Sequence, residues 1–116
     1  MAKNDDVQRF LNDFHVKLSI YDILFSYNRP KNINMLLALE ITPNNRKEII
    51  ARLKVNDYCE GPIDDKLYGI ASMWVFGIAL NRKEIYIKIS MGRYQQPVIC
   101  ISFHKSEYPL KYQLKK

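Results

Sequence analysis

Two neighbouring segments near the C-terminus alternate between apolar and polar side chains, and this constrains the fold more than any other feature of the sequence. In residues 84–91 every odd position holds isoleucine or methionine, and in residues 97–104 positions 99, 101 and 103 hold two isoleucines and a phenylalanine. A period of two is typical of strands with one buried face. Because only Gly92–Gln96 links the segments, the sequence predicts an antiparallel hairpin.

A third strand and two helices are predicted around this hairpin. Residues 73–80 form an apolar run, and the link 81–83 is short enough for a second hairpin. Residues 5–14 show helical spacing of their apolar side chains, and Thr42-Pro43 is typical of the start of a helix, here expected to run to Leu53. Its inward positions would be Ile49, Ile50 and Leu53, and its exposed positions Arg46, Lys47 and Arg52. The predicted class is α+β: an antiparallel β-meander of three or more strands with N-terminal helices packed on one face.

The remaining segments give less regular patterns. Residues 16–26 alternate at Val16, Leu18 and Ile20, which favours a strand that runs into an irregular segment. Residues 27–30 are expected to form a turn, residues 32–39 a short helix, and residues 54–70 a polar connection. The chain of 116 residues is expected to be a single domain, 1–116. Residues 105–116 form an aromatic–basic tail that could grip RNA or be a flexible, disordered end.

The positive charge is confined to the last third of the chain. Residues 1–77 hold ten basic and ten acidic side chains, whereas residues 78–116 hold eight basic and two acidic ones, so this segment carries the whole net charge of +6. One-sided positive charge indicates a polyanionic partner, with nucleic acid first. The basic residues expected to bind RNA are Arg82, Lys83, Arg93, Lys105 and Lys111.

Several classes of protein are excluded by the composition. No apolar run approaches the roughly 20 residues that span a bilayer, and the N-terminus is too acidic for a secretory signal, so no membrane association and a cytoplasmic location are expected. The two cysteines, Cys59 and Cys100, are then expected to be reduced. With two histidines they show no zinc-ligand spacing, and neither a metal nor another cofactor is predicted.

A polar patch is predicted on the outer face of the two-stranded segment. If the isoleucine-rich faces line the core, Tyr86, Lys88, Ser102 and His104 share the opposite face, with Lys88 near Cys100 and Tyr86 near Ser102. Histidine can transfer a proton near neutral pH, lysine can stabilise charge on a phosphoryl group, and tyrosine can stack on a base. Together they suit metal-independent cleavage of RNA, in which a base activates the 2′-hydroxyl.

Each of these residues also has an ordinary structural interpretation. His104 is compatible with a surface position, Tyr86 with cross-strand packing and Lys88 with a role in solubility. Cys100, predicted on the same face, could pair with His104 as a nucleophile or act as a small buried hydrophobe.

The same two strands resemble a known family. The stretch Glu84–Ile89, a short connection and then Val98–His104 look like the C-terminal hairpin of MqsR-type toxins, which are mRNA interferases of bacterial type II toxin–antitoxin systems with a RelE-like fold. Asn56-Asp57-Tyr58 after a helix and Met73-Trp74 at the start of a strand follow the same order, so the resemblance covers about residues 43–104.

This resemblance implies cleavage of mRNA and inhibition by a cognate antitoxin protein. Separately from the resemblance, a homodimer is an assembly with which the sequence is compatible. By position, Tyr86 matches the active-site tyrosine of the family, and His104 stands where the family has a catalytic lysine. Two positions depart from the pattern, because a lysine of the family falls at Glu60 and a glutamine at Val75. The hypothesis is therefore a toxin-like endoribonuclease that uses His104, Tyr86 and Lys88. The alternative is a catalytically inactive module of the same fold that binds nucleic acid or protein.

Overall fold

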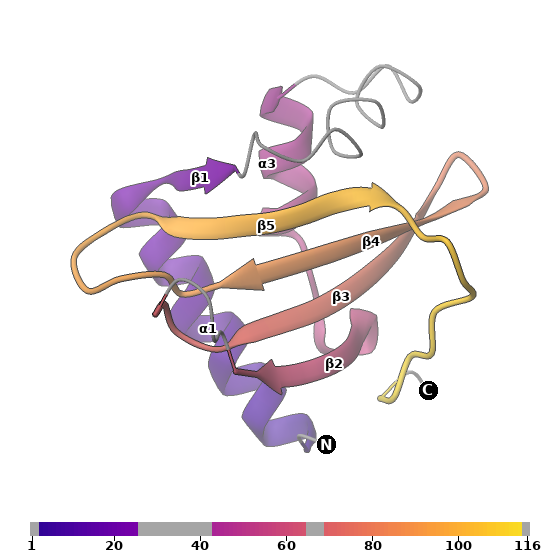
Figure 1. Cartoon of the computed structure of the whole chain (residues 1–116), viewed down its shortest axis with the longest axis horizontal. Helices are drawn as coiled ribbons and strands as arrows, with labels where there is room; N and C mark the ends of the chain where they lie inside the picture. The colour runs from indigo at the N-terminus through magenta and orange to yellow at the C-terminus, as the bar shows by residue number, and fades with distance from the viewer. Residues whose placement is uncertain (1–2, 26–42, 65–68, 115–116) are drawn as a thin grey trace.

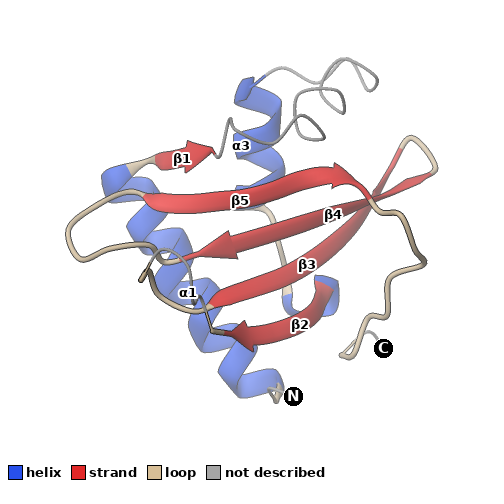
Figure 2. Ribbon diagram, in the orientation of Figure 1, coloured by secondary structure: helices blue, strands red, loops and turns tan. Residues whose placement is uncertain are grey.

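Five strands form one sheet in the described part of the chain, and helices cover one of its faces (Figures 1 and 2). The computed structural model describes residues 3–25, 43–64 and 69–114. In chain order the elements are α1 (Asn4–Tyr21), β1 (Ile23–Phe25), α3 (Pro43–Ala51), a 3-10 turn η1 (Val55–Asp57), β2 (Tyr58–Ile63), β3 (Met73–Leu80), β4 (Lys83–Ser90) and β5 (Val98–Lys105).

The sheet has the order β1-β5-β4-β3-β2. Strands β2 to β5 pair antiparallel with their neighbours in the chain, and β1 adds a parallel edge beside β5. The predicted α+β class, with an antiparallel meander and N-terminal helices on one face, is confirmed, and the arrangement is compatible with a RelE-like fold. Neither described helix is both long and apolar enough to cross a membrane.

Helix α1 is longer than predicted. The strand expected to begin at Val16 in the 16–26 segment is wrong, because the helix runs to Tyr21 and a strand, β1, occupies only Ile23–Phe25. Val7, Phe10, Leu11 and Phe14 are buried as expected, but Leu18 extends their stripe by one more turn and is also buried. Because Phe14 and Leu18 are four residues apart, they share one helical face. The apparent alternation came from side chains that point to solvent, since Val16 is 59% exposed.

Helix α3 begins at Pro43 as predicted, but its exposed face was wrongly assigned at Arg46. Ile50 and Leu53 are buried, as expected. Arg46 is also buried, and its guanidinium carbon lies 3.4 Å from the centre of the Phe25 ring. A planar guanidinium stacks well on an aromatic face, which explains why a charged residue occupies an inward position here.

Part of the expected polar connection at residues 54–70 is an edge strand. The sequence of β2, with Glu60, Gly61 and Pro62, reads as a loop, yet Tyr58 is fully buried and its hydroxyl donates to the Gly61 carbonyl at 2.6 Å. Proline is tolerated because one side of an edge strand needs no ladder bond. The predicted turn at 27–30 and helix at 32–39 lie outside the described residues.

A β-bulge in β5 changes which side chains face the helices. Ile89 pairs with Cys100, but the preceding residue Lys88 pairs with Ser102, so Ile101 is an extra residue. Before the bulge, Cys100 faces the core, and after it Phe103 does. The predicted faces were therefore right from Ser102 onward and wrong for the first half of the strand.

Candidate functional site

The predicted polar residues of β4 and β5 lie together on the sheet face opposite the helices. Tyr86 is directly opposite His104, and their rings stack with centres 5.2 Å apart and planes 14° from parallel. Lys88 is directly opposite Ser102. The grouping agrees with the sequence analysis, but the pairing is shifted by two residues because the bulge absorbs one residue and the loop is longer on one side.

A pocket of about 250 Å³ opens over this group. One wall comes from β4 and β5, and the other from the segment that follows β5. The lining residues are Tyr86, Lys88, Ser102, His104, Ser106, Glu107, Tyr108 and Leu110. From the sequence, residues 105–116 were expected either to grip RNA as an aromatic–basic tail, with Tyr108 and Lys111 among its residues, or to be a disordered end.

This segment, residues 106–113, is called the strap below. It leaves the end of β5 and runs to the start of β2, as Figure 1 shows in yellow. The Ser106 amide donates to the Glu84 carbonyl at 2.9 Å, and the Gln113 amide donates to the Tyr58 carbonyl at 3.2 Å. Between these ends, Leu110 and Tyr112 lie against Gly77 of β3. The sequence analysis expected a flexible tail here; these contacts connect residues 106–113 to strands β2, β3 and β4.

The hydrogen bond of His104 indicates which of its two ring nitrogens carries the proton. Nδ1 lies 2.9 Å from the Lys105 carbonyl oxygen. Since a carbonyl can only accept, Nδ1 carries the proton in this arrangement. In a neutral ring Nε2 is then the basic nitrogen, so His104 is arranged to accept a proton at Nε2.

The other predicted RNA-binding residues are spread over both ends of the sheet. Arg82 and Lys83 lie at the β3–β4 turn, where Asn81 and Arg82 both have positive φ, as in the tightest hairpin loops. Lys105 pairs with Ile85 and so lies on the opposite face from His104. Arg93 lies in the loop between β4 and β5. Figure 1 shows this loop at the opposite end of β4 from the β3–β4 turn.

Lys111 is exposed on the strap. Of the basic residues proposed from the sequence, only Lys88 lines the pocket. The structure therefore brings the three candidate catalytic residues together and does not gather the basic residues around them.

The two positions that depart from the resembled family lie in the same row of the sheet as Lys88. Glu60 pairs with Val75, Val75 pairs with Lys88, and Lys88 pairs with Ser102. Val75 is buried and Glu60 is exposed. This row supplies one carboxylate and one apolar side chain beside the lysine.

The expected position of Cys100 on the outer face is wrong. Its side chain is fully buried in the core, because it precedes the bulge. Burial raises the pKa of its thiol to about 12, with the charge of Arg46 acting in the opposite direction. A buried thiol that holds its proton does not serve as a nucleophile, so the interpretation as a small hydrophobe is the better one. Cys59 also carries a free thiol.

The raised pKa of Cys100 predicts a loss of stability at alkaline pH. Below pH 9 the thiol is protonated in both folded and unfolded chains, and between pH 9 and about 12 only the unfolded chain loses the proton. The free energy of unfolding should therefore fall as pH rises through this range, by up to about 1.4 kcal/mol per pH unit from one thiol. Denaturant titrations at several pH values should give a shallower slope for Cys100→Ala than for the wild type. Identical slopes would contradict the assignment.

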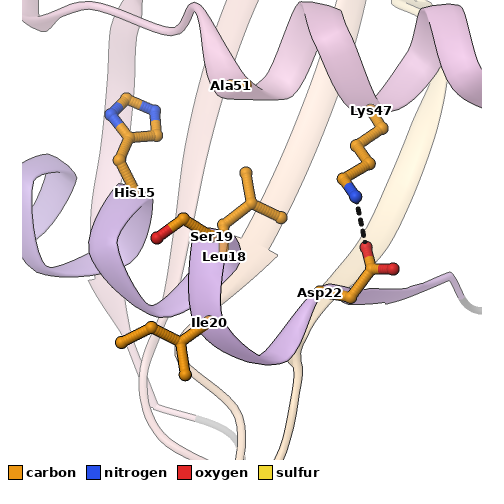
Figure 3. Close-up of a pocket in the computed structure, with 7 residues that line it drawn as sticks. All are labelled: His15, Leu18, Ser19, Ile20, Asp22, Lys47 and Ala51. Carbon is orange, nitrogen blue, oxygen red and sulfur yellow. Dashed lines mark ion pairs between the residues drawn. The ribbon is translucent and has the colours of Figure 1, made fainter.

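A second, larger hollow of about 530 Å³ lies between α1 and α3 (Figure 3). Its polar groups are bonded to each other or to backbone. Lys47 and Asp22 form an ion pair at 2.7 Å, which lowers the pKa of Asp22, while His15 Nε2 lies 3.3 Å from the Ile50 carbonyl oxygen. Figure 3 shows His15 and the ion pair at opposite ends, with Leu18 and Ser19 between them. The side chains around this hollow connect the two helices, and they do not form a group of catalytic residues.

Two residues that shape the pocket were missed in the sequence. Glu84 accepts from the Leu110 amide at 3.3 Å and from the Tyr112 hydroxyl at 2.9 Å. Gly77 leaves room for the strap, because a Cβ there would collide with Leu110. A glycine inside an apolar strand is a signal of close approach by another segment, and it could have indicated the strap.

Comparisons with family models, with curated proteins and with solved structures gave no match. Among residues 3–25, 43–64 and 69–114, no three histidine, cysteine or acidic side chains group as metal ligands. The case for a function thus depends on the geometry of the pocket and on the residues that line it.

Proposed function

We propose that the protein is a toxin-like, metal-independent endoribonuclease that cleaves mRNA at the pocket over β4 and β5. The observation that carries the proposal is the stacked pair of Tyr86 and His104 beside Lys88 in one pocket. Cleavage through the 2′-hydroxyl of RNA needs a base, a cation for the phosphoryl charge and an acid for the leaving oxygen. His104 and Lys88 offer these groups, and Tyr86 stacks on the histidine.

In the proposed reaction His104 Nε2 removes the proton from a ribose 2′-hydroxyl. The 2′-oxygen attacks the adjacent phosphorus, and the bond from phosphorus to the 5′-oxygen breaks. The imidazolium returns its proton to the leaving 5′-oxygen, so the products are a 2′,3′-cyclic phosphate and a 5′-hydroxyl. Lys88 stabilises the charge on the phosphoryl oxygens, and Tyr86 orients His104 by stacking or contacts the RNA.

The size and setting of the pocket favour an unpaired stretch of RNA. Its volume of about 250 Å³ is below the range of roughly 300–1,000 Å³ that is common for drug-sized ligands. Exposed Tyr108 at its rim offers a surface on which a base can stack. Control by a cognate antitoxin belongs to the proposal through the resemblance to MqsR-type toxins.

The proposal predicts a specific product. Purified protein incubated with a long mRNA in excess chelator should release fragments that end in 2′,3′-cyclic phosphate, detected by end-group analysis. A Lys88→Met variant purified in the same way should cleave at least about 100-fold more slowly, because the phosphoryl charge loses its cation. Fragments with a linear 3′-hydroxyl end, or equal rates for both proteins, would contradict the mechanism.

A binding module without catalysis is the second candidate, and two observations favour it. Glu60 and Val75 stand in the same row as Lys88, and Glu107 lines the pocket. These side chains bring negative charge near the single pocket lysine and remove polar groups that the resembled family uses. Binding of RNA by wild-type protein without any cleavage would support this candidate.

A further inference from the structure

The strap is the one pocket wall that does not belong to the sheet. Ser106, Glu107, Tyr108 and Leu110 line the side opposite the stacked rings. Without them Tyr86 and His104 would lie on an open sheet surface. The strap is therefore what turns a row of side chains into a pocket.

The strap is held to the sheet at several points, and the contacts converge on one side chain. Both carboxylate oxygens of Glu84 accept bonds from it, Oε1 from the Leu110 amide and Oε2 from the Tyr112 hydroxyl. Hydrogen bonds to a charged group are among the stronger ones in proteins. The pKa of Tyr112 is raised, first by burial and then by this bond and charge, so the phenol keeps the proton that it donates.

The strap packs against the bare backbone of Gly77, and a side chain there would force Leu110 and Tyr112 to move. A Cβ at this position would lie 2.9 Å from the Tyr112 hydroxyl oxygen and would also collide with the Leu110 side chain. Gly77 is paired directly with Tyr86, so the strap crosses the sheet in the row of the stacked rings. Its far end lies over β2, where the Gln113 amide donates to the carbonyl of Tyr58, the residue before Cys59.

We infer that the strap is part of the RNA-binding site, and that Glu84 and Gly77 are positioning residues that hold it over Tyr86 and His104. This inference rests on the proposed function, because it assigns the strap to the same pocket. The strap supplies binding contacts, whereas the groups that react lie on β4 and β5. Release of the strap should thus weaken binding of RNA more than it slows the chemical step.

Two variants release the strap in independent ways. Tyr112→Phe removes only the hydroxyl that donates to Glu84, and Gly77→Ala places a methyl group under Leu110 and Tyr112. Tyr94→Phe is the matched control, because Tyr94 is 88% exposed in the loop between β4 and β5. Glu84→Ala should weaken RNA binding in the same way, because it removes both acceptors of the strap. Glu84→Gln keeps one oxygen acceptor and should retain part of the binding that Glu84→Ala loses.

The two cysteines report whether the strap has moved. Cys59 is 9% exposed next to Tyr58, whose carbonyl accepts from the strap, and Cys100 is fully buried in the core. Alkylation by iodoacetamide at about pH 8 should become at least about five-fold faster at Cys59 in both variants, with Cys100 unchanged. Faster alkylation at both cysteines of a variant would show that the variant unfolds in general. If this happens with Gly77→Ala, the result for Tyr112→Phe, the milder change, decides whether the strap has been released.

Steady-state kinetics with a fluorescent single-stranded RNA of about twelve nucleotides complete the test. We expect KM to rise about 10-fold in both variants while kcat changes less than about two-fold, as the loss of one bond to a charged group predicts.

An unchanged KM in a variant whose Cys59 reacts faster would overturn the inference, and so would faster cleavage. An unchanged alkylation rate at Cys59 in both variants would overturn it as well. If the wild type binds this RNA without cutting it, catalysis fails as a function, and a Kd that weakens about 10-fold still supports the strap. If the wild type does not bind RNA, both proposals fall.

Discussion

Replacing His104 with alanine should lower the rate of RNA cleavage by about 1,000-fold, within the range of roughly 100- to 10,000-fold that general acid–base catalysis contributes. The reason is the position of the ring. It stacks on Tyr86, its Nδ1 is committed to the Lys105 carbonyl, and Nε2 is the nitrogen left to move a proton. Alanine removes both proton acceptance and the acid that returns the proton.

His104→Gln separates proton transfer from hydrogen bonding. Glutamine offers polar groups but cannot take up a proton at neutral pH, so its rate should fall nearly as far as that of alanine. Tyr94→Phe is the control, because Tyr94 is 88% exposed in the loop between β4 and β5 and does not line the pocket. Rates are measured from single-turnover cleavage of labelled RNA, and circular dichroism verifies the fold. Retained cleavage in both His104 variants would remove this residue from the mechanism.

Replacing Phe76 with alanine should lower the free energy of unfolding by about 4 kcal/mol, as large-to-small changes of aromatic core residues do. Phe76 is fully buried in β3, and its ring lies 6.2 Å from that of Phe10 and 6.1 Å from that of Tyr58. It therefore joins α1, β3 and β2 in one cluster, and its loss leaves a cavity that three elements would have to fill.

The effect of Phe76→Ala is large against the roughly 5–15 kcal/mol that stabilises an ordinary domain. Tyr94→Ala should change stability by less than about 0.5 kcal/mol, since it removes a ring that is 88% exposed. Urea denaturation followed by tryptophan fluorescence measures both variants. A loss below about 1 kcal/mol for Phe76→Ala would show that the core is packed differently from the arrangement described above.

The sequence predicted the strands well where apolar and polar side chains alternate regularly. It predicted side-chain positions poorly where a bulge or a contact with a distant residue determines them. The three longest strands and the buried stripe of α1 follow directly from spacing. The first half of β5 was misassigned, because an extra residue in a strand leaves no mark in an alternating pattern. Arg46 was placed outside since a charge is normally solvated, and only the nearby Phe25 ring makes an inward position favourable.

The site was predicted in part for similar reasons. Tyr86, Lys88, Ser102 and His104 lie after the bulge or on the regular strand β4, so counting by two was enough to group them. The strap was not found, because its contacts with Glu84 and Gly77 join residues that are 26 and 33 positions apart from Leu110 in the chain. Sequence spacing gives no information about such distant contacts.

The extra residue at Ile101 gives β5 a point of tolerance for changes in length. Removal of this residue would leave Cys100 and Phe103 pointing inward and His104 pointing outward, because a regular strand of that length has the same alternation. A deletion farther from the bulge would turn over the side chains that lie between the deleted residue and Ile101. The strand that presents the histidine therefore contains, at the bulge, a place where evolution can shorten the chain and keep both the interior and the pocket in phase.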